Sequence, residues 1–507
     1  MESEFDNVLH RHLDDAVQNV VWRCIYHLSD KTINLTKFLT MNRFNVRKPL
    51  LSVVMLCAMG IVGCKDDSTA GGGQPYDPSK PIELTDFYPK EGKYQEKVIL
   101  QGSNFGTDPS AIRVYFNQRP AAVIGTTGSE IYVQAPRLPG DECKLSVVIG
   151  EDSVVYNDIF LYESSMTVAT VVGNGTKIYK AGTLAEAQVS PYYCCVDESG
   201  NVFVISRNGD EGDVSTIARI DEVNSELVTL ASNTIGNVPC VDPETQVVSF
   251  ATETTIGSFM TLDPKEMWAP RYREMKWPAG IPAQITNGYK HCMVVNPDDG
   301  YIYCRFYFGQ VVRIDPKSYE TTVIAVTPQG DSYGLSFNPQ HPNILYITMD
   351  SNGLAYETPQ GTLGTANSIC CIDVSAYNGY DDPAEAQAAC LETFERLSSP
   401  QTSGGHRDGK LENAQFRRPF QMFCDADGNM YIADCDNQCI RRMVIDRDNY
   451  RTGTVETVLG MPGTAGWQDG TEEEALFQYP RGIGIAEDGT VYVADYGNAR
   501  IRKLSIN

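Results

Sequence analysis

The chain has 507 residues, of which 42% are hydrophobic, and its formal net charge is −24 at pH 7. Such an acidic surface repels polyphosphate, so the charge excludes nucleic acid as an expected partner and disfavours direct adhesion to anionic lipid. The many Gly and Tyr residues and the small number of apolar runs beyond strand length favour an all-β chain, and the length exceeds that of one typical domain.

The N-terminal region has the layout of a secretory leader. Arg43, Arg47 and Lys48 precede an apolar run over residues 49–62, which is too short to be a permanent membrane span. The run ends in an Ile-Val-Gly-Cys sequence that resembles a bacterial lipobox, with Cys64 as the lipidated first residue of the mature chain. An uncleaved membrane anchor is the alternative interpretation.

Residues 1–40 do not fit this leader, and Met41 is a natural start, so we interpret 1–63 as an upstream extension followed by a lipoprotein signal peptide. If residues 1–40 are translated, the signal sequence is unusually long. The Lys-Asp-Asp after Cys64 resembles the export signal of Bacteroidetes surface lipoproteins. Residues 64–81 are rich in Gly, Pro, Asp and Ser and predict a flexible tether. We therefore expect a protein that is lipid-anchored in the outer membrane and faces the cell surface.

A small β-sandwich is predicted over residues 82–163. Short alternating runs at regular turn spacing are typical of immunoglobulin-like sandwiches. The Gly-Ser-Asn-Phe-Gly turn at residues 102–106 and the strand patterns around it resemble the IPT/TIG domain. In surface lipoproteins this module usually acts as a spacer. We therefore interpret Phe87, Phe105 and Phe116 as core residues rather than ligand contacts.

The last hundred residues contain a repeat. Residues 427–434 read Asp-Gly-Asn-Met-Tyr-Ile-Ala-Asp and residues 488–495 read Asp-Gly-Thr-Val-Tyr-Val-Ala-Asp; an Asn and an Ile-Arg pair follow each copy. Short strands separated by Gly and Asp turns at a fixed period indicate a repeat array whose units must pack together to bury their faces. These residues resemble the NHL-repeat β-propeller family.

Weaker copies upstream share an inner-strand segment that runs into a turn. The resemblance predicts a six-bladed NHL-type β-propeller over residues 166–507. The last unit lacks an outermost strand, whereas residues 166–173 form a strand with no unit of their own. We therefore expect this N-terminal strand to close the last blade and remove a free sheet edge. The six inner-strand segments are 194–197, 239–242, 293–296, 335–338, 422–425 and 483–486.

The cysteines lack the spacing of a disulfide framework or a zinc site, although twelve of them follow Cys64. We interpret them mainly as buried small hydrophobic residues, and a local bridge between Cys435 and Cys439 is left open. Four of them fall on predicted inner strands: Cys195, Cys240, Cys292 and Cys424.

The propeller shows no catalytic constellation. Its histidines are His291, His341 and His406, and they cannot supply the several histidine ligands of the metal-dependent lyases among NHL-type propellers. The chain has no Gly-x-Ser-x-Gly elbow and no His-Glu-x-x-His motif. We predict no catalytic residue, no metal and no cofactor, and a lyase or hydrolase sited in the channel remains an alternative.

One position of the repeat gathers aromatic and planar polar side chains. It lies five residues before the end of each inner-strand segment, where the inner strands enter the channel. These side chains either plug the channel or bind a ligand at its mouth. The six residues expected to form this ring are Tyr192, Asn237, His291, Tyr333, Phe420 and Arg481.

The connections between blades add further aromatic residues. We expect Trp268, Trp277 and Trp467, together with His406, to lie in these connections on the same face as the ring. Flat rings beside amide, guanidinium and carboxylate groups suit sugars, whose C–H faces stack on the rings while their hydroxyls form hydrogen bonds. Alternatively, the tryptophans pack beneath long loops.

The leader and the aromatic face together predict a non-catalytic cell-surface lipoprotein that binds a complex polysaccharide or oligosaccharide. An outer-membrane transporter or other surface proteins are the protein partners this location suggests. A protein-interaction scaffold is the alternative, because NHL propellers often bind peptides or proteins on one face. Fold alone does not choose between these functions.

The lipobox makes the first testable prediction. A Cys64→Ala variant lacks the thiol that carries the acyl chains, so it should leave the membrane fraction or remain unprocessed. Fractionation of cells followed by immunoblotting measures this. Membrane retention and processing equal to those of the parent would contradict the lipoprotein interpretation.

Overall fold

The computed structural model describes residues 74–136, 142–163, 166–207, 215–253, 257–286, 288–358 and 361–506. The predicted leader, the lipidation site Cys64 and most of the tether lie outside these residues. Within the described ranges no helix is long and apolar enough to span a membrane.

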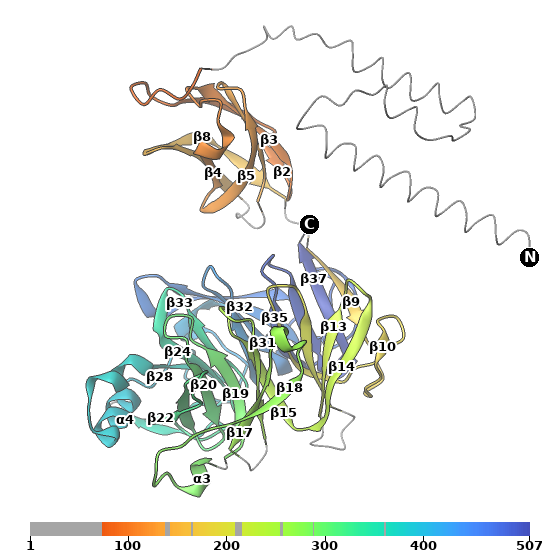
Figure 1. Ribbon diagram of the computed structural model, residues 1–507, viewed down its shortest axis with the longest axis vertical. Coiled ribbons are helices and arrows are strands. Elements are labelled where there is room, and N and C mark those ends of the chain that lie inside the picture. The colour runs from red at the N-terminus through yellow and green to blue at the C-terminus, as the bar shows by residue number, and fades with distance from the viewer. Residues whose placement is uncertain are drawn as a thin grey trace, which may run out of the picture. The chain divides into compact units, whose positions relative to one another are not determined.

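The predicted sandwich is formed by eight strands in the order β1-β3-β6-β5-β4-β7-β8-β2 (Figure 1). Strand β5 pairs with β4 through its first residues and with β6 through its later ones, so it joins the two halves of the sandwich. The strands are β1 (Glu83–Tyr88), β2 (Glu91–Gly92), β3 (Lys97–Ser103), β4 (Ile112–Phe116), β5 (Arg119–Thr126), β6 (Glu130–Gln134), β7 (Glu142–Ile149) and β8 (Asp152–Tyr162).

The core of the sandwich contains the three phenylalanines that the sequence placed there. Phe87, Phe105 and Phe116 are buried in one apolar cluster. Phe116 packs edge-to-face against Phe160, with ring centroids 5.2 Å apart. The interpretation of these residues as core is confirmed.

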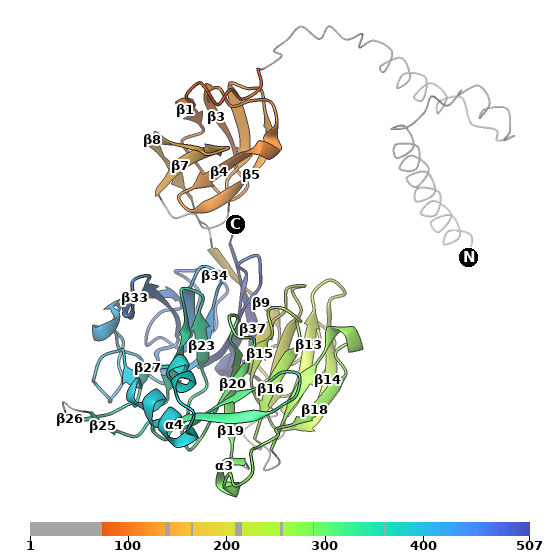
Figure 2. The ribbon, with the colours of Figure 1, turned by 60° about the vertical axis from the view of Figure 1, so that its left-hand side comes forward.

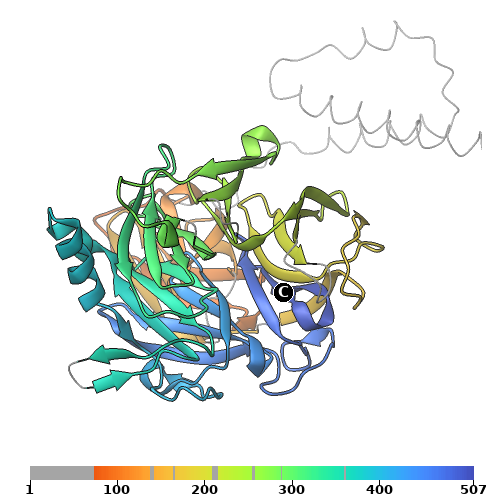
Figure 3. The same cartoon turned by 90° about the horizontal axis from the view of Figure 1, so that it is seen from below.

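The remaining strands form sheets arranged around a common centre in a propeller-like manner (Figure 3). The first sheet has the order β10-β14-β13-β12-β11, and the next has the order β18-β17-β16-β15-β19-β20-β21-β22. Their strands are β10 (Gly182–Thr183), β11 (Pro191–Val196), β12 (Val202–Arg207), β13 (Ser215–Asp221), β14 (Glu226–Thr234), β15 (Gly236–Val241), β16 (Val248–Thr252), β17 (Ser258–Leu262), β18 (Pro270–Glu274), β19 (Lys290–Val295), β20 (Ile302–Phe306), β21 (Gln310–Ile314) and β22 (Thr321–Val326).

Three further sheets have the orders β23-β24-β27-β28, β29-β33-β32-β31-β30 and β34-β9-β37-β36-β35, and β25 pairs only with β26. The strands are β9 (Met166–Val172), β23 (Leu335–Asn338), β24 (His341–Met349), β25 (Tyr356–Thr358), β26 (Gly361–Leu363), β27 (Ser368–Asp373), β28 (Glu395–Arg396), β29 (Gly409–Lys410), β30 (Pro419–Cys424), β31 (Asn429–Asp434), β32 (Cys439–Asp446), β33 (Asn449–Leu459), β34 (Gly470–Thr471), β35 (Pro480–Ile485), β36 (Val491–Asp495) and β37 (Arg500–Ile506).

The inner strands enclose the centre. Strand β11 contacts β15, and contacts continue through β19, β23, β30 and β35 back to β11, so these six strands form a closed ring. They contain the six segments that the sequence predicted as inner strands, except that five of the strands end one residue before the end of the segment. In the eight-stranded sheet, β15 and β19 are joined by a single parallel pair, Val238 with Cys292.

The N-terminal strand closes the last sheet. Strand β9 runs antiparallel to β37, and the pairing extends from Met166–Ile506 to Val172–Ile501. This is the pairing that the sequence predicted from the missing outer strand. Because β9 comes from the start of the propeller and β37 from its end, their hydrogen bonds join the two ends of the repeat array and protect the edge of β37.

The helices of the described ranges are short, and the longest of these belongs to an insertion that the sequence analysis did not predict. Helix α4 lies with the β25–β26 hairpin at the periphery of the sheets (Figure 2). Asp382 caps it by accepting hydrogen bonds from the backbone N–H groups of Ala384 and Glu385, and Pro383 occupies its first turn. The helices are η2 (Pro109–Ala111), η3 (Pro264–Glu266), α3 (Ala283–Thr286), η4 (Val374–Gly379), α4 (Pro383–Glu392), η5 (Leu411–Asn413), η6 (Cys435–Asn437) and η7 (Tyr496–Asn498).

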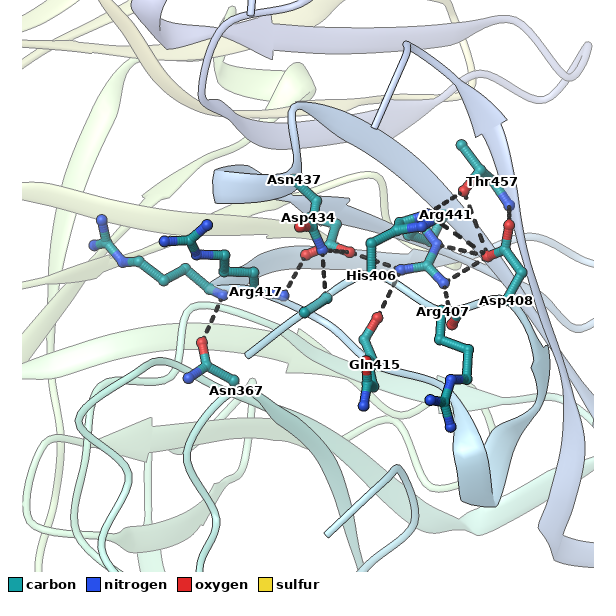
Figure 4. A network of polar contacts seen from close by, with 12 residues as sticks. Asn367, His406, Arg407, Asp408, Gln415, Arg417, Asp434, Asn437, Arg441 and Thr457 are labelled. Atoms are coloured by element: carbon teal, nitrogen blue, oxygen red, sulfur yellow. Dashed lines mark hydrogen bonds and ion pairs between the residues drawn. The ribbon is translucent and has the colours of Figure 1, made fainter. Parts of the chain in front are cut away.

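The signature residues of the last two units form buried polar networks, and Figure 4 shows the one around Asp434 and Arg441. Arg441 is fully buried and donates to Asp434 Oδ2 at 2.7 Å and to the carbonyl oxygen of Gln415 at 3.0 Å. Asn437 also donates to Asp434 Oδ2, at 2.9 Å. The last sheet repeats the arrangement, with Arg502 Nη1 3.0 Å from Asp495 Oδ2. The repeat signature therefore holds each unit together internally.

Burial affects the protonation of this pair. Loss of hydration raises the pKa of Asp434 to about 6, although the guanidinium of Arg441 acts in the opposite direction. A carboxyl whose pKa is higher in the folded than in the unfolded state binds more protons when folded. Its contribution to stability therefore falls as the pH rises from about 4 to about 6.

Arg441→Met tests this network. The substitution leaves the Asp434 carboxylate buried without its cation, so the free energy of unfolding should fall by about 3–5 kcal/mol at pH 8. The loss should be smaller at pH 5, where Asp434 is protonated in the folded variant. Urea denaturation of the chain without its leader measures both values.

Arg442→Met is the matched control. Arg442 lies next along β32, but its ion pair with Glu456 is exposed, so its loss should cost less than about 1 kcal/mol. Equal losses in the two variants, or a loss in Arg441→Met that does not change with pH, would contradict the role given to the buried pair.

Candidate binding site at the channel mouth

The channel mouth is the set of side chains at the N-terminal ends of the six inner strands. Contacts connect the residues that the sequence placed there. The guanidinium carbon of Arg481 lies 4.6 Å from the ring centroid of Tyr192 and 5.2 Å from that of Phe420. Phe420 stacks on Tyr333, and Tyr333 stacks on His291. Residues from five sheets far apart in the sequence thus meet at one place.

The stacked rings of the mouth cover one another. Tyr333 lies 5.1 Å from Phe420 with an interplanar angle of 5°, and 4.8 Å from His291 with an angle of 25°. Phe420 and His291 are 2% and 4% exposed. Stacked neighbours therefore occupy much of the Tyr333 ring, which is half-buried. The aromatic part of the ring plugs the channel, which the sequence left open as an alternative.

Asn237 anchors the polar side of the mouth. It is fully buried, and its Nδ2 donates to Glu253 Oε1 at 2.6 Å and to the carbonyl oxygen of Lys290 at 3.0 Å. Its Oδ1 accepts from Arg207 Nη2 at 3.1 Å, and Arg207 lies 3.6 Å from Glu253. Asn237 therefore has a structural role. It positions Arg207 and Glu253, whose side chains are less buried.

Carboxylates and arginines from neighbouring strand ends complete the mouth. Arg418 Nε donates to Asp350 Oδ1 at 3.0 Å, and Asp331 Oδ1 lies 3.6 Å from His291 Nε2. The sequence analysis missed these residues together with Arg207 and Glu253. A second strand returns antiparallel to the first, so its last residues reach the same end of the sheet. Applied to the sequence, this rule would have placed Arg207, Glu253 and Asp350 at the channel mouth.

His291 is neutral in this environment. Burial lowers the pKa of its imidazole to about 3, and the nearby Arg305 acts in the same direction. The backbone N–H of Ser332 donates to His291 Nδ1 at 3.4 Å. The folded state of a histidine with a lowered pKa binds fewer protons than the unfolded state, so this group costs stability as the pH falls below about 6.5.

Exposed aromatic residues surround the mouth at positions that the sequence analysis did not select. Tyr289 directly precedes β19, Tyr479 directly precedes β35, and Phe308 follows β20. They are 49%, 42% and 45% exposed, respectively. Ring surface for a ligand is therefore offered by these residues rather than by the covered stack of Tyr333 and Phe420.

The tryptophans are placed differently from one another. Trp268 lies between β17 and β18, at the end of the strands opposite the mouth, and packs near Phe203. The predicted position of Trp268 on the ring face is therefore wrong. The error arose because a turn within a sheet was taken for a connection between sheets.

Trp277 and Trp467 do lie in connections that lead to the next inner strand. Trp277 is half-buried and packs edge-to-face on Phe306, with ring centroids 6.2 Å apart. Trp467 is 52% exposed, and its Nε1 donates to Thr170 Oγ1 at 3.2 Å. His406 belongs to the network of Figure 4, where its Nε2 lies 2.8 Å from Thr457 Oγ1.

Gln421 crosses the channel below the mouth. Its Nε2 donates to the carbonyl oxygen of Cys194 at 2.6 Å, and its Oε1 accepts from the backbone N–H groups of Cys194 and Ile483, both at 3.3 Å. A cavity of about 470 Å³ lies beyond it, toward the far ends of the inner strands. Its lining is mostly aliphatic, with residues such as Val238, Met293 and Phe337, and it offers few groups to a hydroxyl-rich ligand.

The cysteines of the described ranges are free thiols, and all but Cys424 are buried. The interpretation as buried small side chains is confirmed for Cys195, Cys240 and Cys292 of the inner strands, whereas Cys424 is half-buried. Cys435 and Cys439 do not form the local bridge that the sequence left open. No group of three or more His, Cys, Asp and Glu side chains with metal-binding geometry occurs among the described residues.

Two known family models match parts of the chain. Residues 81–166 match the IPT/TIG domain, and residues 477–504 match the NHL repeat. The curated Protein SUPPRESSOR OF QUENCHING 1, chloroplastic, from Arabidopsis thaliana is 32% identical over 103 residues. These residues are 20% of this chain and 9% of that protein, so the match spans under a tenth of the relative.

Several of the solved structures similar to this chain come from Bacteroides species. A structural genomics protein of unknown function from Bacteroides thetaiotaomicron is 25% identical, with a TM-score of 0.71, over 85% of this chain and 100% of that chain. An auxiliary nutrient binding protein from the same organism is 22% identical, with a TM-score of 0.51, over 85% and 99%. One from Bacteroides ovatus is 19% identical, with a TM-score of 0.51, over 86% and 100%.

Proposed function

We propose that this protein is a non-catalytic, lipid-anchored surface protein that binds a complex oligosaccharide or polysaccharide at the channel mouth. One observation carries the proposal. Aromatic, amide, carboxylate and guanidinium groups from separate sheets meet at this mouth, and exposed rings surround it. The groups at the mouth include an aromatic ring, two carboxylates and a guanidinium, from Tyr333, Asp331, Glu253 and Arg481.

The chemistry of the mouth suits sugars. Carboxylates accept hydrogen bonds from hydroxyls, and exposed rings such as Tyr289 and Tyr479 can stack on the C–H face of a sugar. The sugar-binding surface is then the rim, with the covered stack of Tyr333 and Phe420 as its floor. The similar Bacteroides proteins that are named auxiliary nutrient binding proteins support a binding role. The lipobox-like sequence at Cys64 supports a surface location.

We further propose that residues 82–163 are a spacer and that residues 166–507 are a six-bladed propeller. Six inner strands form the closed ring, and the eight-stranded sheet is joined by only one parallel pair. Division of that sheet between β15 and β19 leaves four strands on each side. For both domains we keep the residue ranges that were predicted from the sequence.

A protein-interaction scaffold is the second candidate. Helix α4 and the β25–β26 hairpin line a cavity of about 1170 Å³ with Tyr356, Leu391 and Phe394. Leu391 and nearby Val326 are exposed apolar side chains. An apolar surface on an insertion fits a protein partner. We do not propose the channel lyase or hydrolase, because no observation on the described residues favours it.

Alanine substitutions at the rim test the first candidate. Tyr289→Ala and Tyr479→Ala should each weaken oligosaccharide binding by about 1–2 kcal/mol, roughly 5- to 30-fold, because each removes an exposed stacking surface. A glycan array identifies the ligand, and titration calorimetry with the soluble chain from Asp66 measures the affinity.

Tyr88→Ala is the matched control, because Tyr88 is 72% exposed on the sandwich rather than on the propeller. Its affinity should equal that of the parent, and the melting temperature verifies folding in all three variants. Folded rim variants that bind the glycan as tightly as the parent would refute a site at the mouth.

A further inference from the structure

We propose that Arg481 is an anion anchor and that the bound glycan carries a carboxylate, as a uronic acid residue does. The inference rests on the proposed function and names its ligand class. It starts from a difference between Arg481 and the other arginines of the mouth.

The other arginines of the mouth have partners within the chain. Arg418 forms a two-pronged contact with Asp350, with Nε–Oδ1 at 3.0 Å and Nη2–Oδ2 at 3.3 Å, and its Nη1 lies 3.6 Å from Asp436. Arg207 lies 3.6 Å from Glu253 and donates to the carbonyl oxygen of Gly236 at 3.2 Å. Their charges are compensated before any ligand arrives.

The guanidinium of Arg481 packs against three aromatic rings. Its guanidinium carbon is 3.9 Å from the ring centroid of Tyr496, 4.6 Å from that of Tyr192 and 5.2 Å from that of Phe420. Over the described ranges it makes no ion pair, and its buried Nε has no hydrogen-bond partner. Tyrosines and Cys435 are the neighbours whose charge would raise its pKa, and no carboxylate is among them.

Ring faces hold a guanidinium in place but do not satisfy its N–H groups. The cation–π attraction acts through the face of the ring, whereas the five donors point outward in the guanidinium plane. Leaving such donors without acceptors in a desolvated site costs free energy. A carboxylate matches the planar fork with two parallel hydrogen bonds. The cage of Tyr192, Phe420 and Tyr496 therefore preorganises Arg481 for a carboxylate ligand.

The remainder of the mouth favours a carboxylate that belongs to a sugar. Glu253 follows β16 and Asp331 precedes β23, whereas Arg481 lies on β35, between β11 and β30 in the ring. The acidic groups are thus on the side of the mouth away from Arg481. A simple anion would use only Arg481, but a uronate also offers hydroxyl donors to Glu253 and Asp331.

The experiment uses the soluble chain from Asp66 and pairs of defined oligosaccharides. Each uronate-containing member, such as oligogalacturonate or a glucuronate oligosaccharide, is compared with its carboxyl-reduced counterpart. Reduction should weaken binding roughly 10- to 100-fold, the range expected for loss of a charge-assisted hydrogen bond. Arg481→Gln should bind both members of a pair equally and as weakly as the parent binds the reduced one.

Two further variants keep the test decisive. Arg481→Lys retains the charge without the fork and should bind the acidic member less tightly than the parent. Arg442→Gln removes an exposed arginine elsewhere and should bind like the parent. Melting temperatures verify folding. If Arg481→Gln fails to fold, two results still test the proposal. They are the difference in the parent's affinity for the acidic and reduced glycans and the affinity of Arg481→Lys for the acidic glycan.

The outcomes separate the two proposals. If the parent binds acidic and reduced glycans equally, the carboxylate inference is overturned and the glycan function stands. If it prefers acidic glycans but Arg481→Gln keeps that preference, the assignment to Arg481 is overturned. If no glycan binds, but a carboxylate-bearing peptide binds the parent and not Arg481→Gln, the glycan function and the uronate ligand are both overturned. Binding of no probe overturns both proposals as well.

Discussion

The closed ring of six inner strands is the constraint on which the candidate site depends. Because β35 contacts β11 as well as β30, the strands cannot drift apart, and their N-terminal ends meet at one mouth. A single sequence position per unit is thereby repeated around one centre. Tyr192, Phe420 and Arg481 come from three different sheets, yet they lie in direct contact there. The pairing of β9 with β37 maintains that closure between the two ends of the array.

The arginines of the propeller differ in the partners of their guanidinium groups. Arg441 and Arg502 are completely buried, and each contacts an aspartate and backbone carbonyls within its own unit. Buried charge of this kind is tolerated because all its donors find acceptors. Arg481 lies in an aromatic cage without such acceptors. Arg207, Arg219 and Arg500 also have a buried Nε without a partner, but Arg207 and Arg219 lie in ion pairs and Arg500 donates to a backbone carbonyl, whereas no ion pair or hydrogen bond of the Arg481 guanidinium is seen among the described residues.

Sequence patterns predicted those features that repeat along the chain. The strands, the order of the inner segments and the ring at the mouth all follow from period and turn position, which are local properties. The patterns could not show that His291 and Phe420 stack on Tyr333, because the three residues are joined only by tertiary packing. Trp268 was misplaced because its sheet diverges from the repeat, and its turn could not be aligned with the others.

The rim residues and the insertion were missed for a related reason. Tyr289 and Tyr479 flank inner strands, but their exposure depends on what the neighbouring sheets leave uncovered. Helix α4 has a local signal in the Asp382-Pro383 cap, and it interrupts a β repeat that dominated the interpretation of that region. Exposure and insertion geometry are decided by long-range contacts, which a single sequence does not display.

Hydrogen–deuterium exchange with and without a saturating oligosaccharide tests the central claim most directly, because it locates the bound ligand without any substitution. The account predicts added protection in backbone segments at the mouth, around residues 191–193, 289–292 and 478–482. Protection confined to the insertion at 356–396 or to the sandwich, with none at the mouth, would contradict it.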